Sequence, residues 1–172
     1  NEISMSDGFV SRTLEAGQPS RTQRNMWELV VGHRDPEVRA VAAAHPAAPA
    51  DLLERLSADS DPVVLLAVAR NPNATPAILR RLVADADAET RWAALAHPRI
   101  PRDVLRYEGL HAPCRAIGEN PKTPSDVLTA MSTLFGHPSD EFDPSGEFCF
   151  ERAAVASNPN TPEHVLRTLM RD

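Results

Sequence analysis

The sequence has 172 residues, enough for one compact domain with a sizeable core. Its formal net charge of −6 excludes a general attraction of the whole molecule for nucleic acid or acidic membrane surfaces. No apolar run approaches the ~18–20 residues needed to span a bilayer. Residues 1–9 also lack the charged-then-apolar pattern of a signal peptide. We therefore expect a soluble, cytoplasmic protein with no membrane partner.

An internal repeat dominates the chain. A step of Asn or His followed by Pro recurs with successive spacings of 26, 26, 23 and 38 residues, at His45-Pro46, Asn71-Pro72, His97-Pro98, Asn120-Pro121 and Asn158-Pro159. An insertion near residues 135–147 lengthens the last spacing. We expect residues 1–8 to form an N-terminal tail and residues 9–172 to form one solenoid of about five to six units.

One predicted helix follows each step. Thr123-Pro124 and Thr161-Pro162 predict a hydroxyl N-cap with proline at the first helical position. An aliphatic pair comes next, and a further core position follows three residues later, which predicts one buried helix face. The pairs are Leu52-Leu53, Ile78-Leu79, Val104-Leu105, Val127-Leu128 and Val165-Leu166.

Another predicted helix precedes each step. Asp35-Pro36, Asp61-Pro62 and Asp87-Ala88 begin it with Asp as the N-cap, and the proline of the step ends it. Its apolar side chains are small, so neighbouring helices can approach closely. We expect these to form its core face: Val38, Val41, Ala42, Val64, Ala67 and Val68. Helices of about nine residues are unstable alone, so each unit must bury its apolar face against the next.

The string Asp-Pro-x-Val-Arg…Asn/His-Pro-x-x-Pro-x-x-Val-Leu resembles the leucine-rich repeat variant family, which is distantly similar to armadillo and HEAT repeats. Residues 35–56, 61–82 and 151–169 match it well. The resemblance implies an all-α, right-handed superhelix of alternating α and 3₁₀ helices without enzymatic activity. Some members carry an iron–sulfur cluster on an N-terminal cysteine cluster. No cysteine precedes Cys114 here, so we expect no cofactor and no metal.

The central segment, residues 70–106, carries seven arginines against four acidic residues. Arg80 and Arg106 occupy the same repeat position, and Arg55 and Arg81 share the next one, so each pair is expected on one exposed face. This arginine stripe is a candidate site for an acidic protein or a nucleic acid. The alternative is an ordinary solvated face, because few stacking aromatics accompany it.

Two other columns favour structural roles. In four units an arginine lies six residues before the step, and we expect each to bind a capping Asp or a helix C-terminal carbonyl: Arg12, Arg39, Arg91 and Arg152. The Asn and His of the step itself are expected to bond local backbone. His45 and His97 lie two units apart, roughly 20 Å, which is too far for one zinc ion to join.

The insertion near residues 135–147 is the second candidate binding site, with Asp140, Glu141, Phe142 and Asp143 at its centre. Insertions in solenoids map to one face, often the binding face. Acidic residues mixed with Phe suit a basic, apolar partner, and the alternative is that the Phe side chains cover the core of the last units. The spacing does not fit an EF-hand calcium loop.

No nucleophile, phosphate-loop or paired-carboxylate motif stands out. We therefore expect a non-catalytic scaffold that binds another protein. One alternative is nucleic-acid or other polyanion binding through the arginine stripe, and another is an enzyme with a site in the superhelix groove. A third is self-association through the C-terminal repeat, where Leu166, Leu169 and Met170 lie close to the end of the sequence.

Overall fold

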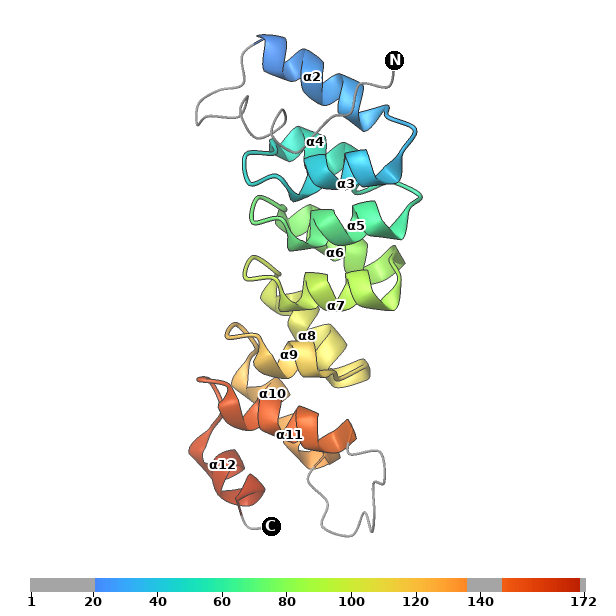
Figure 1. Ribbon diagram of the computed structural model, residues 1–172. Helices are drawn as coiled ribbons and strands as arrows, with labels where there is room; N and C mark the ends of the chain where they lie inside the picture. The colour runs from blue at the N-terminus through green and yellow to red at the C-terminus, as the bar shows by residue number, and fades with distance from the viewer. Residues whose placement is uncertain (1–20, 136–146, 171–172) are drawn as a thin grey trace. The chain divides into compact units, whose positions relative to one another are not determined.

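The computed structural model describes residues 21–135 and 147–170 (Figure 1). These residues form α-helices and no strand, which confirms the predicted all-α class. The expected tail, residues 1–8, and nearly all of the expected insertion lie outside the described residues. The helices are α2 (Arg21–Val31), α3 (Pro36–Ala44), α4 (Ala50–Leu56), α5 (Pro62–Arg70), α6 (Pro76–Asp85), α7 (Ala88–Ala96), α8 (Arg102–His111), α9 (Arg115–Glu119), α10 (Ser125–Phe135), α11 (Glu147–Ser157) and α12 (Glu163–Leu169).

The helix before each step begins where the sequence predicts. Asp35, Asp61 and Asp87 are the N-caps of α3, α5 and α7, and each carboxylate accepts a bond from the backbone N–H two residues on. Proline follows the first two caps as the first helical residue, where its missing N–H costs no hydrogen bond. These starts are confirmed.

The same helices end in a tightened turn. The N–H of His45 donates to the carbonyl of Ala42 at 3.3 Å, and the N–H of Asn120 donates to that of Ile117 at 3.2 Å, each three residues back. The family resemblance implied alternating α and 3₁₀ helices. In the part of the chain that is described, both helices of a repeat are α-helices, and three-residue bonding of this kind closes the first of them.

The helix after the step begins one residue later than predicted at two places. Pro162 is the N-cap of α12 and has extended backbone, and α10 begins at Ser125. The prediction that Thr123 and Thr161 cap these helices is therefore wrong. The Thr123 hydroxyl instead donates to the carbonyl of Ile117 at 2.6 Å, and the Thr161 hydroxyl donates to that of Val155. Both hydroxyls satisfy the C-terminal carbonyls of the helix before the step.

The chain divides into two compact units, Asn1–Ile78 and Leu79–Asp172. In the first unit, α3 packs along α5 and α2 packs along α4, so helices of the same kind lie side by side in successive repeats (Figure 1). The aliphatic pair lies in the core as predicted, since Leu52 is 3 % and Leu53 is 0 % exposed. Val64 and Val68 of α5 are also completely buried.

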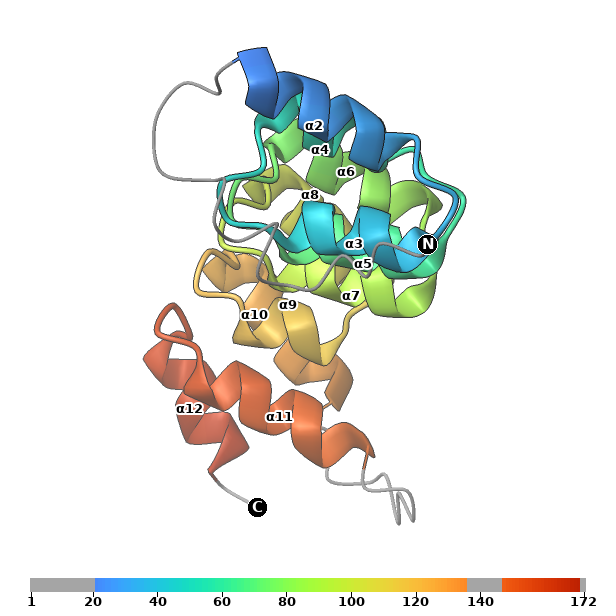
Figure 2. The same ribbon diagram turned by 45° about the horizontal axis from the view of Figure 1, so that its top comes forward.

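The second unit repeats this arrangement: α7, α9 and α11 form one row, and α8, α10 and α12 form the other (Figure 2). Two glycines allow successive helices within each row to pack closely. A Cβ on Gly109 of α8 would lie 2.3 Å from Cγ1 of Val127, and one on Gly118 of α9 would lie 2.9 Å from Cβ of Ala154. Neither position has room for a side chain. Small residues therefore let neighbouring helices approach closely here, as predicted.

The asparagine of the step joins each repeat to the one before it. The Asn120 amide donates to the carbonyls of Leu95 at 2.8 Å and His97 at 3.4 Å, and its Oδ1 accepts from the N–H of Lys122. Asn71 and Asn158 make the same three bonds in their own repeats. We call this set of side-chain bonds the amide ladder. The local bond to the backbone was predicted, and the bond across to the preceding repeat was not.

Candidate functional site

The arginine stripe is a chain of ion pairs between repeats. Arg80 on α6 makes two bonds to the carboxylate of Asp103 on α8, at 2.6 and 3.3 Å. Arg106, one turn further along α8, pairs with Asp126 on α10 at 2.9 Å. The Arg80 guanidinium also lowers the pKa of Asp103 below its ordinary value. Both of these predicted arginines therefore pair with an acidic residue of the following repeat.

Arg55 and Arg81, the other two predicted arginines, lie in different units. Arg55 on α4 pairs with Glu28 on α2 at 2.7 Å, and both side chains are largely exposed. Arg81 on α6 is half-buried and so presents less of its side chain than Arg80 does. The three exposed arginines of the predicted stripe, Arg55, Arg80 and Arg106, thus each pair with an acidic residue of a neighbouring repeat.

The arginines inside the first helices hold structure, as expected from their position. Arg39 on α3 makes two bonds to Asp59, at 2.6 and 2.8 Å, and a third to the carbonyl of His33. Arg152 on α11 donates to the carbonyl of Leu169 at the end of α12. Arg91 on α7 pairs with Glu108, which occupies a core position that is aliphatic in most repeats. Arg12 lies outside the described residues.

Asp140, Glu141, Phe142 and Asp143 also lie outside the described residues, so the insertion stays a prediction. The helix that follows it carries an exposed aromatic ring. Phe150 on α11 is 58 % exposed, and the guanidinium of Arg115 lies over its ring, 5.6 Å from the ring centre.

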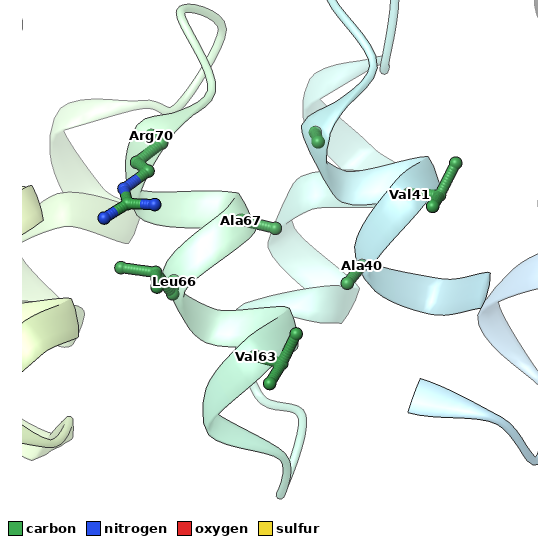
Figure 3. A pocket seen from close by; sticks show the side chains of 7 residues that line it. Ala40, Val41, Val63, Leu66, Ala67 and Arg70 are labelled. Carbon is green, nitrogen blue, oxygen red and sulfur yellow. The ribbon is translucent and has the colours of Figure 1, made fainter. Parts of the chain in front are cut away.

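An apolar groove lies on α3 and α5, within the first unit. Its volume is about 350 Å³, and its lining is almost wholly aliphatic. Ala40 and Ala67 lie between the two helices, and Val41 and Val63 lie further out, as Figure 3 shows. Leu66 and Arg70 continue the lining on the side of α5 turned away from α3. Small residues at the base leave room for a ligand to approach the backbone.

The groove exposes one side chain that the sequence placed in the core, Val41. Val41 is 46 % exposed and Val63 is 45 % exposed, whereas Ala42 beside Val41 is only 2 % exposed. The expectation that Val41 belongs to the core face is wrong, because that face of α3 is filled by alanines. The groove was not predicted, although the sequence contains a signal for it. The segment from Pro62 to Ala69 is apolar throughout, which is more than one buried stripe of a nine-residue helix requires.

The described residues give little indication of a metal site, a reactive thiol or a membrane-spanning helix. They contain no group of three or more His, Cys, Asp and Glu side chains placed to hold a metal ion. Burial raises the pKa of the Cys114 thiol, which makes it a poor nucleophile at neutral pH. None of the helices described is long and apolar enough to cross a membrane.

The profile of the leucine rich repeat variant family matches two segments of the chain, residues 36–61 and 150–172. The first segment contains α3 and α4, and the second contains most of α11 and all of α12. The match confirms the resemblance seen in the Asn/His-Pro pattern. Comparisons with curated proteins and with solved structures gave no significant match.

Proposed function

We propose that this chain, with two segments that match the leucine rich repeat variant, is a non-catalytic scaffold that binds another protein. Paired helices of this kind build a rigid surface whose exposed positions select the partner. The observation that carries the proposal is the apolar groove on α3 and α5.

The groove has the features of a peptide-binding surface. Exposed apolar side chains that cluster at a concave site mark interaction surfaces, whereas single scattered ones do not. The exposed side chains of Val41 and Val63 both line the groove, and alanines form its base. Aliphatic side chains of an amphipathic helix would fit between the two valines. The partner that suits this site is therefore a protein segment with one apolar face.

Polyanion binding is the weaker alternative because of the ion pairs along the arginine stripe. Counterion release from nucleic acid requires basic groups that can turn to phosphate. Arg80 and Arg106 each bind an acid of the next repeat, and a phosphate would have to displace Asp103 or Asp126. The acids also repel a phosphate backbone.

The experiment is an affinity capture from lysate of the native host, with wild type and Val63→Asp compared by mass spectrometry. A charge in the groove should abolish capture of the protein partner, because a buried unpaired carboxylate is costly. The matched control is Leu29→Asp, which makes the same kind of change on α2 of the same unit, at a side chain that is 73 % exposed. We expect Leu29→Asp to capture the partner as wild type does.

Two further variants separate the remaining sites. Loss of the partner on deletion of residues 140–146, with Val63→Asp still active, would move the site to the insertion. Nuclease-sensitive material that co-purifies with wild type and is lost with Arg80→Ala/Arg106→Ala would contradict the scaffold proposal and establish polyanion binding.

A further inference from the structure

The two helices that form the groove, α3 and α5, run in the same direction. The amide of Asn71, directly after α5, donates to the carbonyls of Ala43 and His45 at the end of α3, at 2.6 and 2.9 Å. The C-terminal ends of the two helices therefore lie side by side (Figure 1). A third helix that lies along the groove must run either with both of them or against both.

The two ends of the groove carry opposite charges. Arg70 lines the groove at the C-terminal end of α5, and Val63 lies at the other end of the same helix, as Figure 3 shows. Glu37 is exposed in the first turn of α3, four residues before Val41 and thus on the same side of that helix. The Arg70 side chain is exposed too, and its guanidinium has five N–H donors, so it can bind an incoming carboxylate in addition to its contacts within the chain.

The separation of these charges sets the spacing of a matching helix. Glu37 lies eight residues before His45, and Arg70 lies one residue before Asn71. The two charges are therefore offset by seven residues, which is about 10.5 Å along the helix axes, or two helical turns. A helix with opposite charges seven residues apart and two apolar residues midway between them presents all four side chains on one face.

The direction of the bound helix follows from its own dipole. A helix is most stable with acidic residues in its first turn and basic residues in its last turn. Such a helix sets its acid against Arg70 and its base against Glu37 only when it runs opposite to α3 and α5. We propose that the groove binds an amphipathic helix of a partner protein, antiparallel to α3 and α5, with the pattern acid-x-x-apolar-apolar-x-x-base. The pattern and the direction rest on the proposed function, which assigns the groove to a protein partner.

The required pattern is absent from this sequence. None of its 24 acidic residues is followed by apolar residues at both the third and the fourth position and by Lys or Arg at the seventh. At Asp61, for example, Val64 and Leu65 follow at the apolar positions, but Val68 occupies the position of the base. A second copy of the sequence therefore does not supply the segment that the groove fits, and we assign the helix to a different protein.

The probe for this proposal is a stapled helical peptide, because short helices are unstable alone. It carries glutamate in its first turn, leucine at the third and fourth positions after the glutamate, and lysine at the seventh. A second peptide has glutamine in place of the glutamate. NMR titration of each peptide into the isotope-labelled chain gives the Kd and the helices whose signals shift. We expect the glutamate peptide to shift signals of α3 and α5, and Val63→Asp to abolish its binding.

Charge reversal in the chain identifies the ion pairs. Arg70→Glu should weaken the glutamate peptide roughly three- to ten-fold, because an attraction between exposed charges becomes a repulsion, and should change the glutamine peptide little. Glu37→Lys should weaken both peptides, since both carry the lysine. The matched control is Arg55→Glu, which makes the same charge change on α4 of the same unit and should leave both Kd values unchanged.

Spin labels determine the direction of the bound helix. A nitroxide on the first residue of the glutamate peptide should broaden the amide signals around Arg70 more than those around Glu37, and a nitroxide on its last residue should do the reverse. This pattern, together with weakening by both charge reversals, supports the proposal. Broadening in the opposite order, or Kd values that neither reversal changes, overturns it even where Val63→Asp still abolishes binding.

Failure of the inference and failure of the proposed function can be distinguished. Absence of any shift in α3 and α5 at millimolar peptide overturns the inference, whereas the capture experiment with Val63→Asp tests the proposed function without the peptides. Sedimentation of the chain alone should give a monomer. A dimer that Val63→Asp dissociates would assign the groove to a second copy and overturn the inference.

Discussion

At the scale of single residues, the step asparagine joins one repeat to the one before it. Asn120 is 2 % exposed, and its amide donates across the repeat boundary to the carbonyls of Leu95 and His97. The residue type follows from geometry, because one amide both donates to the carbonyls and accepts from a local N–H. The histidine at the same column, His97, accepts from Arg99 in the same local way.

Replacement of that amide should be costly. We expect Asn120→Ala to lower the free energy of unfolding by about 2–3 kcal/mol, because it removes the side-chain donor to the buried Leu95 carbonyl and one of the two donors to the His97 carbonyl. The measurement is urea unfolding followed by circular dichroism. Asn160→Ala is the control: its amide also bonds carbonyls of the preceding repeat, but the side chain is exposed, so its cost should stay below about 1 kcal/mol. Equal costs for the two variants would contradict this view of the ladder.

His45 should make stability depend on pH. Its Nδ1 accepts from the N–H of Ala47, and burial lowers its pKa below the ordinary value. A lowered pKa means that the folded state favours the neutral ring. The contribution is therefore present above the unfolded pKa, about 6.5, and is lost as the pH falls through the folded pKa.

The variant His45→Asn tests this directly, since asparagine takes the same column at Asn71 and accepts the same bond at any pH. We expect the loss of stability between pH 7 and pH 5, measured by urea unfolding, to be smaller in His45→Asn than in wild type. An unchanged loss would show that other groups control the pH dependence.

At the scale of helix pairs, α7 and α8 contain an ion pair where most repeats have packed aliphatic residues. Glu108 is 8 % exposed and Arg91 is its partner. Burial of a carboxylate has a large desolvation cost, and the attraction to its ion-pair partner compensates this cost without adding much net stability. We expect Arg91→Ala to destabilise the fold by about 2 kcal/mol and Glu108→Leu to be neutral or stabilising. Thermal unfolding of both variants and of the double variant checks this, and a more damaging Glu108→Leu would contradict it.

Much of the structure of the helix pairs could be predicted from the sequence. Aspartate caps, proline positions and the aliphatic pairs have local causes, so Asp35, Asp61 and Leu53 lie where the pattern predicts. The cap at Thr161 was misjudged because its hydroxyl has a competing acceptor, the Val155 carbonyl, which only the folded turn brings near. The groove was missed for a similar reason: whether Val41 is covered depends on the neighbouring helix and not on its own periodicity.

The arginine stripe shows the same limit. Its alignment followed from the repeat period, but its ion pairs depend on the offset between successive helices, which sets Arg80 opposite Asp103. Such an offset is a property of packing and leaves no local mark in the sequence.

At the scale of the whole molecule, stability should be a sum of neighbouring contacts. We expect Asn158→Ala to raise hydrogen exchange in α11 and α12, where its amide joins repeats, and to leave α3, α4 and α5 unchanged. Exchange followed by mass spectrometry checks this. A uniform increase along the chain would show that the molecule unfolds only as one cooperative body.

The most direct test of the proposed function is hydrogen exchange of the chain alone and in complex with the protein that wild type captures. We predict slower exchange in α3 (Pro36–Ala44) and α5 (Pro62–Arg70), whose side chains line the groove, with α8 and α10 unaffected. Protection confined to α8 and α10, where the arginine stripe lies, with the groove helices unchanged, would contradict it.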